Sequence, residues 1–444
     1  MSIEKNELHR VKIESYSSEG YGVCRIGGFV VFVKEAAAGD ECVVRIVKVL
    51  KNMAYAIIES IIVPSPARTE RACSVFPKCG GCDFWHISYE EELRLKKERV
   101  LDALSRIGGF DITPEEVFPS PKLISYRNKA QYPVTARDGK AAAGFYRKHS
   151  HEVVPVSSCP IQSDSANTLM SSVVGWMDSN SVPAELIKNI YVRTSSDGGA
   201  FLCIVSQRES LPAEDKLVKA AKSACRELKG VILNINKSSG NAILGDKERV
   251  LWGAGHIEDT LCGLNFRISP LSFFQINHDQ AENLFSRALL YAGLTGVETA
   301  LDLYCGTGTV TLMLARKCKT AIGVEIVPEA IKDAKMNAAE NNILNVRFIC
   351  KDAGEAAEML INENLRPDLI TVDPPRRGLD EKSVSAILRL APKRIVYISC
   401  DPGTLARDCR LLSAGGYSPD RLSIIDMFPR TAHVETVVLM TKCG

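Results

Sequence analysis

The sequence predicts a multidomain protein that combines the β and α/β classes: an N-terminal OB-like β-barrel, a central α+β domain and a C-terminal doubly wound sheet. Residues 7–62 are rich in β-branched and aromatic residues between glycine turns, residues 73–82 hold three cysteines, and helices alternate with apolar strands from about residue 285. The chain of 444 residues is long enough for about three domains. We therefore expect domains at 1–62, 67–262 and 263–444.

The composition is that of an ordinary soluble protein, with 45% hydrophobic residues and a net charge of +2. Any nucleic-acid partner must therefore be bound by a local patch of charge. The N-terminus is charged from Glu4 onward, and no apolar run approaches the ~18 residues that a membrane helix needs. The 15 cysteines, without a secretion signal, suit a reducing compartment. We expect a cytoplasmic protein with no membrane partner.

The N-terminal barrel is expected to contain five short strands separated by turns at Glu19-Gly20, Gly27-Gly28 and Gly39-Asp40. Five short strands in about sixty residues are typical of a small closed barrel, a fold that is often used on RNA. The predicted strands are residues 11–17, 22–26, 29–33, 41–49 and 54–60.

A cysteine motif follows the barrel. Cys73, Cys79 and Cys82 form the pattern C-x5-C-x2-C, and a charged helix is predicted after them, ending at Gly108-Gly109. Three closely spaced thiols in a reducing compartment indicate metal binding. The spacing alone favours zinc, with His86 or a distant cysteine as the fourth ligand.

The central region, residues 120–262, alternates short strands with a few helical stretches, which predicts an antiparallel sheet with one or two helices. Its first part, residues 120–150, is a basic segment with seven lysines and arginines against one acid, Asp138. Basic groups neutralise phosphates and aromatic rings stack on bases, so we expect this segment to bind single-stranded RNA. The side chains concerned are Lys122, Arg127, Lys129, Arg137, Lys140, Arg147 and Lys148, with Tyr126, Tyr132, Phe145 and Tyr146 between them.

The C-terminal domain begins with a glycine loop, Asp302-Leu-Tyr-Cys-Gly306-Thr-Gly308-Thr309, between an apolar strand and a helix. Glu325 ends the next strand, where an acid can accept hydrogen bonds from both hydroxyls of a ribose. A dinucleotide site normally has the pattern G-x-G-x-x-G, which this loop lacks. The loop therefore favours S-adenosylmethionine (SAM) over NAD.

Two further motifs follow buried strands of the same domain. Asp373-Pro-Pro-Arg376 is expected to form an extended loop, because its prolines have a fixed φ and no N–H to pair within a sheet. The arginine argues against an amino-methyltransferase, which would have an aromatic residue after the prolines. Cys400, in Ser399-Cys400-Asp401-Pro402, is expected to face the crevice that holds the cofactor.

These motifs together resemble the uracil-5 RNA methyltransferase family over nearly the whole chain. The resemblance also includes Ser272-Phe-Phe-Gln275-Ile-Asn277 and His433-Val-Glu435-Thr436. It implies a Rossmann-like SAM-dependent methyltransferase domain at the C-terminus, and the N-terminal barrel is similar to the TRAM module of this family.

The resemblance implies the roles of the site residues. Cys400 is the expected nucleophile, which adds to carbon 6 of uracil so that carbon 5 can accept a methyl group, and Glu435 is the expected base. SAM contacts are expected from Gln275, Tyr304, Glu325 and Asp373, with Asp352 near the adenine.

The resemblance also implies that the metal group is a 4Fe–4S cluster and not zinc. The cluster would have a structural role and be bound by Cys73, Cys79, Cys82 and Cys159. Within the family, the TRAM module and the cysteine motif favour large-subunit (23S) ribosomal RNA over tRNA as the substrate. A uracil in folded RNA must leave its stack to reach Cys400, so we expect base flipping. We expect a monomer with no DNA partner. The alternatives are a tRNA uracil-5 methyltransferase, an RNA cytosine-5 methyltransferase and a noncatalytic RNA-binding iron–sulfur protein.

Overall fold

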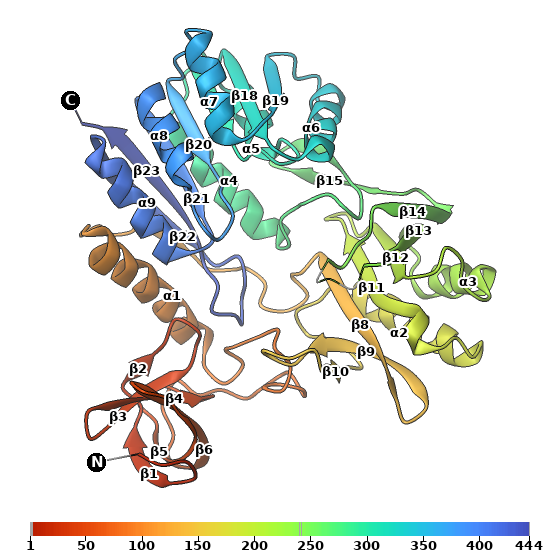
Figure 1. Ribbon diagram of the computed structural model, residues 1–444. Helices are drawn as coiled ribbons and strands as arrows, with labels where there is room; N and C mark the ends of the chain where they lie inside the picture. Colours follow the sequence, from red (N-terminus) through yellow and green to blue (C-terminus); the bar gives the residue numbers. More distant parts are fainter. Residues whose placement is uncertain (1–2, 239, 241, 444) are drawn as a thin grey trace. The chain divides into compact units, whose positions relative to one another are not determined.

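The computed structural model describes residues 3–238, 240 and 242–443 (Figure 1). Within these residues, no helix is both long and apolar enough to cross a membrane. The chain forms two compact units. Unit 1 holds the residues up to Arg99 together with Phe145–Val156 and Phe428–His433, and unit 2 holds Val100–Gly144, Ser157–Met427 and the chain from Val434 onward. The three domain boundaries expected from the sequence stay a prediction.

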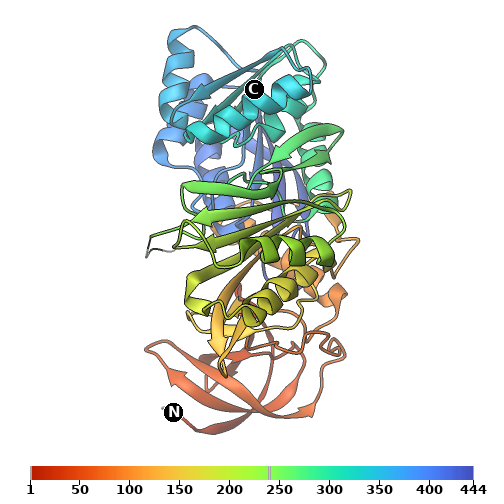
Figure 2. The same cartoon turned by 90° about the vertical axis from the view of Figure 1, so that its right-hand side faces the viewer.

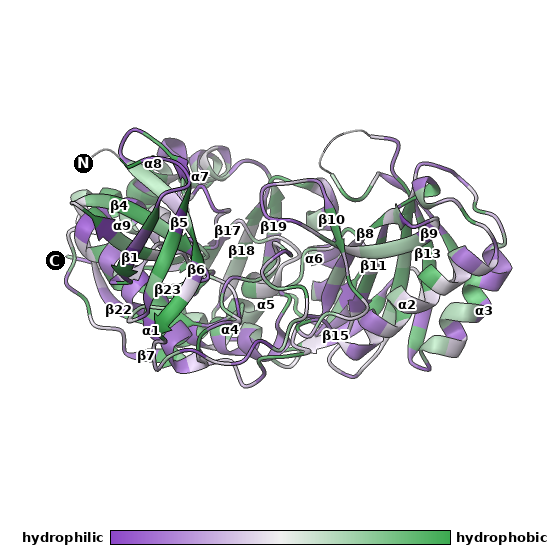
Figure 3. Ribbon diagram, turned by 90° about the horizontal axis from the view of Figure 1, so that it is seen from below, coloured by the Kyte–Doolittle hydropathy of each residue, from purple (hydrophilic) through white to green (hydrophobic). Residues whose placement is uncertain are grey.

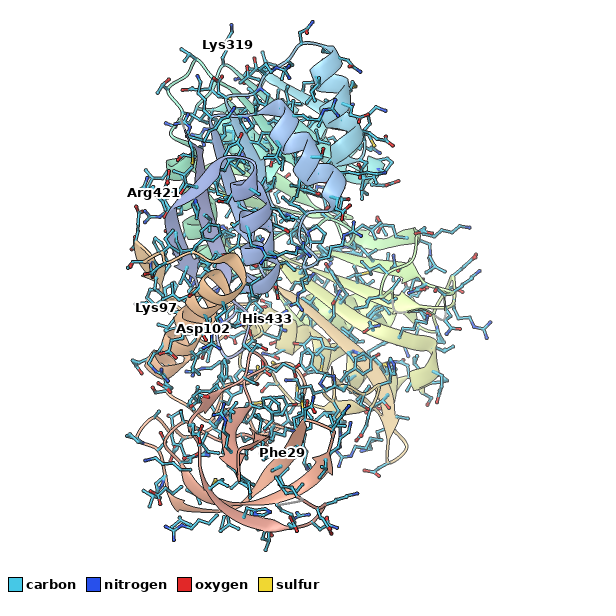
Figure 4. The ribbon with its side chains drawn as sticks, turned by 60° about the vertical axis from the view of Figure 1, so that its left-hand side comes forward. Phe29, Lys97, Asp102, Lys319, Arg421 and His433 are labelled. Atoms are coloured by element: carbon cyan, nitrogen blue, oxygen red, sulfur yellow. The ribbon has the colours of Figure 1, made fainter. Side chains whose placement is uncertain are left out.

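Unit 1 begins with a six-stranded sheet in the order β1-β5-β6-β4-β3-β2. Alternate residues of its strands, such as Val31 and Val33, are fully buried, as the period of two in a strand requires (Phe29 of β4 is labelled in Figure 4). The predicted N-terminal β-barrel fold is confirmed, although the first expected strand is two strands. The strands are β1 (Leu8–Lys12), β2 (Ser15–Tyr16), β3 (Gly22–Ile26), β4 (Phe29–Lys34), β5 (Glu41–Val49) and β6 (Met53–Val63).

The segment Phe428–His433 comes from near the end of the chain but is bonded to the N-terminal residues of unit 1. In helix α1 (Tyr89–Ala103), Lys96 Nζ donates to Glu92 Oε1 at 2.7 Å and to the carbonyl of Phe428 at 3.1 Å. The amide of Ala432 donates to Asp83 Oδ2 at 3.0 Å. His433, labelled in Figure 4, ends this segment two residues before Glu435.

Unit 2 contains a central sheet in which β9, β8, β11, β12, β13 and β14 are neighbours in that order. The expected antiparallel pattern is wrong at one place, because β12 and β13 are parallel: a helix, α3, crosses over between them. Helices α2 and α3 pack together on the same face of the sheet (Figure 2). The elements are β8 (Lys129–Arg137), β9 (Lys140–Tyr146), α2 (Asp164–Ser179), a 3₁₀ turn (Ala184–Leu186), β11 (Ile187–Thr194), β12 (Ala200–Ser206), α3 (Glu214–Ala224), β13 (Leu228–Ile235) and β14 (Lys247–Gly253).

A second sheet in unit 2 has the order β19-β18-β17-β20-β21-β23-β22-β7. Its first five strands are parallel, and β23 runs antiparallel between β21 and β22. The strands are β7 (Glu116–Phe118), β17 (Thr299–Leu303), β18 (Thr320–Glu325), β19 (Val346–Cys350), β20 (Leu369–Val372), β21 (Arg394–Ser399), β22 (Tyr417–Ile425) and β23 (Glu435–Lys442). The other elements are a π-helical turn (Leu104–Gly108), β10 (Val153–Pro155) and the hairpin β15 (Ile257–Leu261) with β16 (Leu264–Ile268).

Helices cover both faces of this second sheet, as expected for a doubly wound fold: α4, α5 and α6 lie on one face and α7, α8 and α9 on the other (Figure 1). Apolar residues are concentrated in the strands (Figure 3), and all four residues of β20 are buried. The helices are α4 (His278–Ala292), α5 (Thr309–Ala315), α6 (Pro328–Glu340), α7 (Ala353–Asn362), α8 (Glu381–Leu390) and α9 (Pro402–Ala414).

Strand β22 was not among the predicted strands because its sequence begins with polar residues and a proline. The register of β22 against β23 shifts between Pro419 and Arg421, which is how a strand accommodates a residue without an amide hydrogen. Arg421, labelled in Figure 4, donates from Nε to Oε1 of Glu115 at 2.6 Å, and Glu115 is the residue before β7.

Candidate active site

The glycine loop leaves β17 through three residues with positive φ: Tyr304 at 69°, Gly306 at 54° and Gly308 at 88°. Such angles favour glycine, and a Cβ on Gly308 would also lie 3.1 Å from the Cβ of Ala334. The amide of Gly306 donates to Glu325 Oε2 at 3.1 Å. The glycine loop and the acid at the end of β18 are therefore in direct contact, and the expected contact of Glu325 with a ribose stays a prediction.

The carboxylate of Glu325 is held in a fixed orientation. Its other oxygen, Oε1, accepts from the amides of Ile326 at 2.8 Å and Val327 at 3.0 Å. A carboxylate has about four acceptor positions, so acceptor capacity remains for hydroxyl groups of a ligand.

Asp302 is a buried acid beneath the glycine loop. It accepts from Thr311 Oγ1 at 2.6 Å and from Thr371 Oγ1 at 2.8 Å, and so joins β17 to α5 and β20. Burial raises the pKa of Asp302 to about 6.

Cys400 and Glu435 lie at the same end of adjacent strands. Strands β21 and β23 are antiparallel, with Ser399 opposite Thr436, so Cys400, which follows β21, lies beside Glu435, which begins β23. Glu435 is buried, with 4% of its surface exposed, and Cys400 is partly buried. Asp373 follows the neighbouring strand β20 and acts electrostatically on both residues. The structure therefore brings together three of the predicted site residues.

Burial and mutual repulsion suppress ionisation of this group. The pKa of Glu435 is raised well above 4.5 by burial and then by Asp373, and the pKa of Asp373 is raised to about 7 by burial and then by Asp302. The pKa of the Cys400 thiol is raised to about 11, first by burial and then by the two acids. A cationic ligand in this site would oppose these shifts, because positive charge favours the ionised forms of acids and thiols.

Gln275 lies on the loop of residues 272–277, whose backbone is held from the central sheet. Arg193 Nη2 donates to the carbonyl of Ser272 at 2.8 Å, and Asn128 Nδ2 donates to the carbonyl of Gln275 at 2.9 Å. Phe273, on the same loop, is 65% exposed. Among the contacts described for residues 3–238, 240 and 242–443, none joins Gln275 to Cys400.

Two predicted SAM contacts have structural partners. Tyr304 Oη lies 2.9 Å from Ser383 Oγ, at the start of α8. Asp352 Oδ1 accepts from the amide of Gly354 at 2.9 Å and caps α7. Capping alone explains an aspartate at position 352.

The three clustered cysteines lie in unit 1 and are partly buried. The amide of Gly81 donates to Cys79 Sγ at 3.4 Å, a type of contact that cluster-bound sulfurs also accept. A Cβ on Gly80 would lie 2.8 Å from the amide nitrogen of Lys148, which explains the glycine. Cys159 belongs to unit 2, where its amide donates to Asn167 Oδ1 at 2.8 Å.

Cysteine thiolates are the usual ligands of an iron–sulfur cluster, but the described side chains of this motif are not arranged around a metal site. In the part of the chain that the structure describes, no three His, Cys, Asp or Glu side chains are placed to hold a metal ion. His86, the alternative zinc ligand, is buried and stacks on Phe76 with ring centroids 5.8 Å apart. The 4Fe–4S cluster stays a prediction.

The basic segment is less exposed and less charged than its sequence indicates. Tyr126 and Tyr132 are buried in the core and cannot stack on RNA bases, which corrects the prediction for these two rings. Lys122 pairs with Asp279 at 2.9 Å, and Arg147 pairs with Glu152 at 2.8 Å, because acids from outside the segment fold against it. Lys148 pairs with Asp83 at 3.0 Å.

Three cations, Arg127, Lys129 and Arg193, lie near the loop of residues 272–277. The sequence analysis included the first two but not Arg193. Arg193 is fully buried, and Lys129 lies opposite it across β8 and β11. Burial, then Arg193 and Arg127, lower the pKa of Lys129 to about 8. Within the described residues no carboxylate pairs with any of the three, and the Nε atoms of Arg127 and Arg193 are buried without a hydrogen-bond acceptor. A lone arginine within the apolar strand Ile187–Thr194 was the signal that could have revealed Arg193.

Known proteins resemble this chain over its whole length. The profile of the tRNA (uracil-5-)-methyltransferase family matches residues 88–443, and that of the TRAM domain matches residues 4–58. An uncharacterised RNA methyltransferase of Clostridium acetobutylicum is 40% identical over 99% of this chain and 98% of its own length. One from Bacillus cereus is 38% identical over 99% and 98%.

The chain belongs to the uracil-5 RNA methyltransferase family. Its fold is also that of the Pyrococcus abyssi tRNA (uracil-54, C5)-methyltransferase in complex with S-adenosyl-L-homocysteine, with a TM-score of 0.79, 26% identity, and coverage of 97% of this chain and 99% of that one. As a uracil-5 RNA methyltransferase, the protein is a SAM-dependent enzyme that acts on RNA. The fold class expected from the sequence is confirmed.

Proposed function

We propose that this enzyme methylates carbon 5 of a uridine in RNA through a covalent adduct between Cys400 and carbon 6. The strongest support is the register that sets Cys400 opposite Glu435, with Asp373 beside them. The Cys400 thiolate adds to carbon 6, which makes carbon 5 an enolate carbon and a nucleophile. SAM, when bound, supplies the methyl group and leaves as S-adenosylhomocysteine. Glu435 then takes the proton from carbon 5, and the bond between carbon 6 and sulfur breaks to release the thiolate.

The residues that would hold SAM are Gln275, Tyr304, Glu325 and Asp373. The contact between Glu325 and Gly306 supports this assignment, since it fixes an acid beside the glycine loop. A sulfonium near Asp373 would favour the carboxylate form of this acid, whose pKa is raised in the free protein.

For the substrate, large-subunit ribosomal RNA is our first proposal and tRNA the second. The first proposal rests on the cysteine motif. The TRAM barrel does not distinguish ribosomal RNA from tRNA enzymes, because the Pyrococcus abyssi enzyme, which is named for tRNA, matches 97% of this chain. That name is also the observation that favours the second.

The proposal is tested with anaerobically purified protein and methyl-labelled SAM, offered unmodified large-subunit ribosomal RNA or unmodified tRNA, followed by digestion to nucleosides. Label in 5-methyluridine from ribosomal RNA alone is the expected result. Label from tRNA alone would keep the reaction and replace the substrate. Label in 5-methylcytidine, or no label with SAM bound, would contradict the proposed reaction.

We expect Arg127 and Lys129, which are partly buried beside the fully buried Arg193, to bind RNA phosphates, because a buried positive charge without a counterion is costly. Replacing both Arg127 and Lys129 with alanine should weaken RNA binding about tenfold or more and lower the salt slope by roughly 1.4, or about 0.7 per phosphate contact. Binding measured at several salt concentrations checks this.

The matched control replaces Arg137 and Lys140, two cations of the same segment. They are opposite each other in the strand register, at the exposed end of the β8–β9 hairpin. We expect a smaller effect from this pair. Equal effects of the two double variants would mean that RNA is attracted by the overall positive charge of the segment, and not bound specifically at Arg127 and Lys129.

The cysteine motif leads to a prediction about metal content. If Cys73, Cys79, Cys82 and Cys159 bind a 4Fe–4S cluster, anaerobically purified protein should contain about four iron and four sulfide per chain, with visible absorbance. Cys159→Ser should lower both contents together, whereas Cys225→Ser, at a buried cysteine outside the motif, should not. Stoichiometric zinc without visible absorbance would overturn the cluster.

A further inference from the structure

Asp408, on α9, is a fully buried carboxylate that the proposed reaction does not use. Its Oδ2 accepts from the amide of Leu379 and from Tyr397 Oη, both at 2.7 Å, and its Oδ1 accepts from Arg407 Nε at 2.8 Å. Tyr397 lies three residues before Cys400 on β21, and Leu379 ends the loop that follows Asp373. One carboxylate therefore connects the strand that leads to the nucleophile with a loop beside it.

This loop, residues 375–379, is fastened to one face of α9. Thr404 Oγ1 donates to the carbonyl of Arg376 at 3.1 Å, and Arg407 Nη2 donates to the carbonyl of Arg377 at 2.9 Å. These side chains and Asp408 are three and four residues apart, the spacing of one helix face. Gly378 has φ 74°, and a Cβ there would lie 2.4 Å from Asp408 Oδ2, so the loop approaches α9 as closely as glycine permits.

The loop carries Arg376, whose charge acts on both proposed catalytic residues. Three acids, Glu435 of β23, Asp373 after β20 and Asp401 at the start of α9, oppose ionisation of Cys400. Among the groups described around the thiol, Arg376 is the one that favours ionisation, and it also acts on Glu435. Its side chain is exposed, so water weakens this effect in the free protein without removing it.

We propose that Asp408 is a positioning residue that joins the strand of Cys400 to the loop of Arg376 and thereby holds the guanidinium beside the nucleophile and the base. The proposal rests on the proposed role of Cys400. It predicts that loss of the Asp408 charge acts on the thiol through Arg376 and not directly, since a negative charge removed from the neighbourhood of a thiol would by itself favour the thiolate.

The test measures the rate at which iodoacetamide alkylates Cys400 in the full chain as a function of pH, by mass spectrometry of the Cys400 peptide. Arg376→Gln should slow alkylation at pH 8 about threefold and move the midpoint of the profile to higher pH. Asp408→Asn should shift the profile in the same direction. The double variant should shift it no further than Arg376→Gln alone, because residues that act through one group are not additive.

Asp420→Asn is the matched control, since Asp420 is exposed on β22 and bonded to Thr441, and it should leave the profile unchanged. If Asp408→Asn does not fold, Thr404→Val and Arg407→Gln break the same loop contacts and should give the same direction of shift. A wild-type or lower midpoint in the Asp408 variant, additive shifts in the double variant, or no shift from Arg376→Gln would each overturn the proposal. The assay contains no RNA and no SAM, so its failure is distinct from a failure of methylation.

Discussion

Replacing Cys400 with alanine is expected to abolish formation of 5-methyluridine, with a loss on the order of 10³-fold or more. Carbon 5 of uracil is too weak a nucleophile to attack a sulfonium until a group adds to carbon 6. Without the thiolate, SAM and RNA should still bind, so their affinities should change little. Single-turnover methyl transfer together with SAM and RNA binding measures the two parts separately.

Cys262→Ala is the control for this variant. Cys262 is also partly buried in unit 2, and burial likewise raises the pKa of its thiol to about 11. It lies in the β15–β16 turn, away from the strand ends that carry the site, and its loss should leave turnover near the wild-type rate. Wild-type methylation by the Cys400 variant would exclude the covalent mechanism.

Replacing Glu435 with glutamine is expected to trap the methylated RNA on the protein. Methyl transfer precedes removal of the carbon 5 proton, so a variant without the base should complete the first and stop at the second. The product should be a protein–RNA adduct that survives a denaturing gel and carries one labelled methyl group. The slow release of RNA from this adduct, compared with wild-type turnover, measures the contribution of Glu435.

Glutamine should be tolerated at this position because it has nearly the shape of glutamate, and burial and Asp373, which raise the pKa of Glu435, favour an uncharged side chain there. Glu363→Gln, at an exposed acid paired with Arg347, should form no adduct. Adding Cys400→Ala to the Glu435 variant should remove the adduct, which identifies the sulfur that forms it. Free turnover by Glu435→Gln would assign the base role to another group.

The fold was largely predictable because its signals are local. Runs such as Leu369–Val372 read as buried parallel strands, and glycines at positions 306 and 308 mark the turn that a cofactor loop requires. The parallel pair β12–β13, the edge strand β7 and its neighbour β22 were not predicted. Their pairing depends on contacts between distant segments, and Pro419 within β22 argues locally against a strand.

The basic segment shows where sequence reasoning failed at the site. Counting charges along residues 120–150 treats every side chain as facing the same surface. Folding buries Tyr126 and Tyr132 and sets Asp279 against Lys122, none of which the order of residues reveals. Arg193 was missed for the same reason, since an arginine in a strand is usually a solvated residue.

Motifs along the chain were enough to predict the family, the TRAM barrel, the doubly wound methyltransferase sheet and the candidate nucleophile and base. These follow from motifs whose chemistry depends on residue type and short spacing. Which charges meet became visible only in the folded chain: Cys400 lies beside Glu435 at the ends of antiparallel strands, Asp302 raises the pKa of Asp373, and Asp408 joins β21 to the loop of Arg376. Electrostatic energies depend on distance in space and on burial, and neither can be read from positions along the chain.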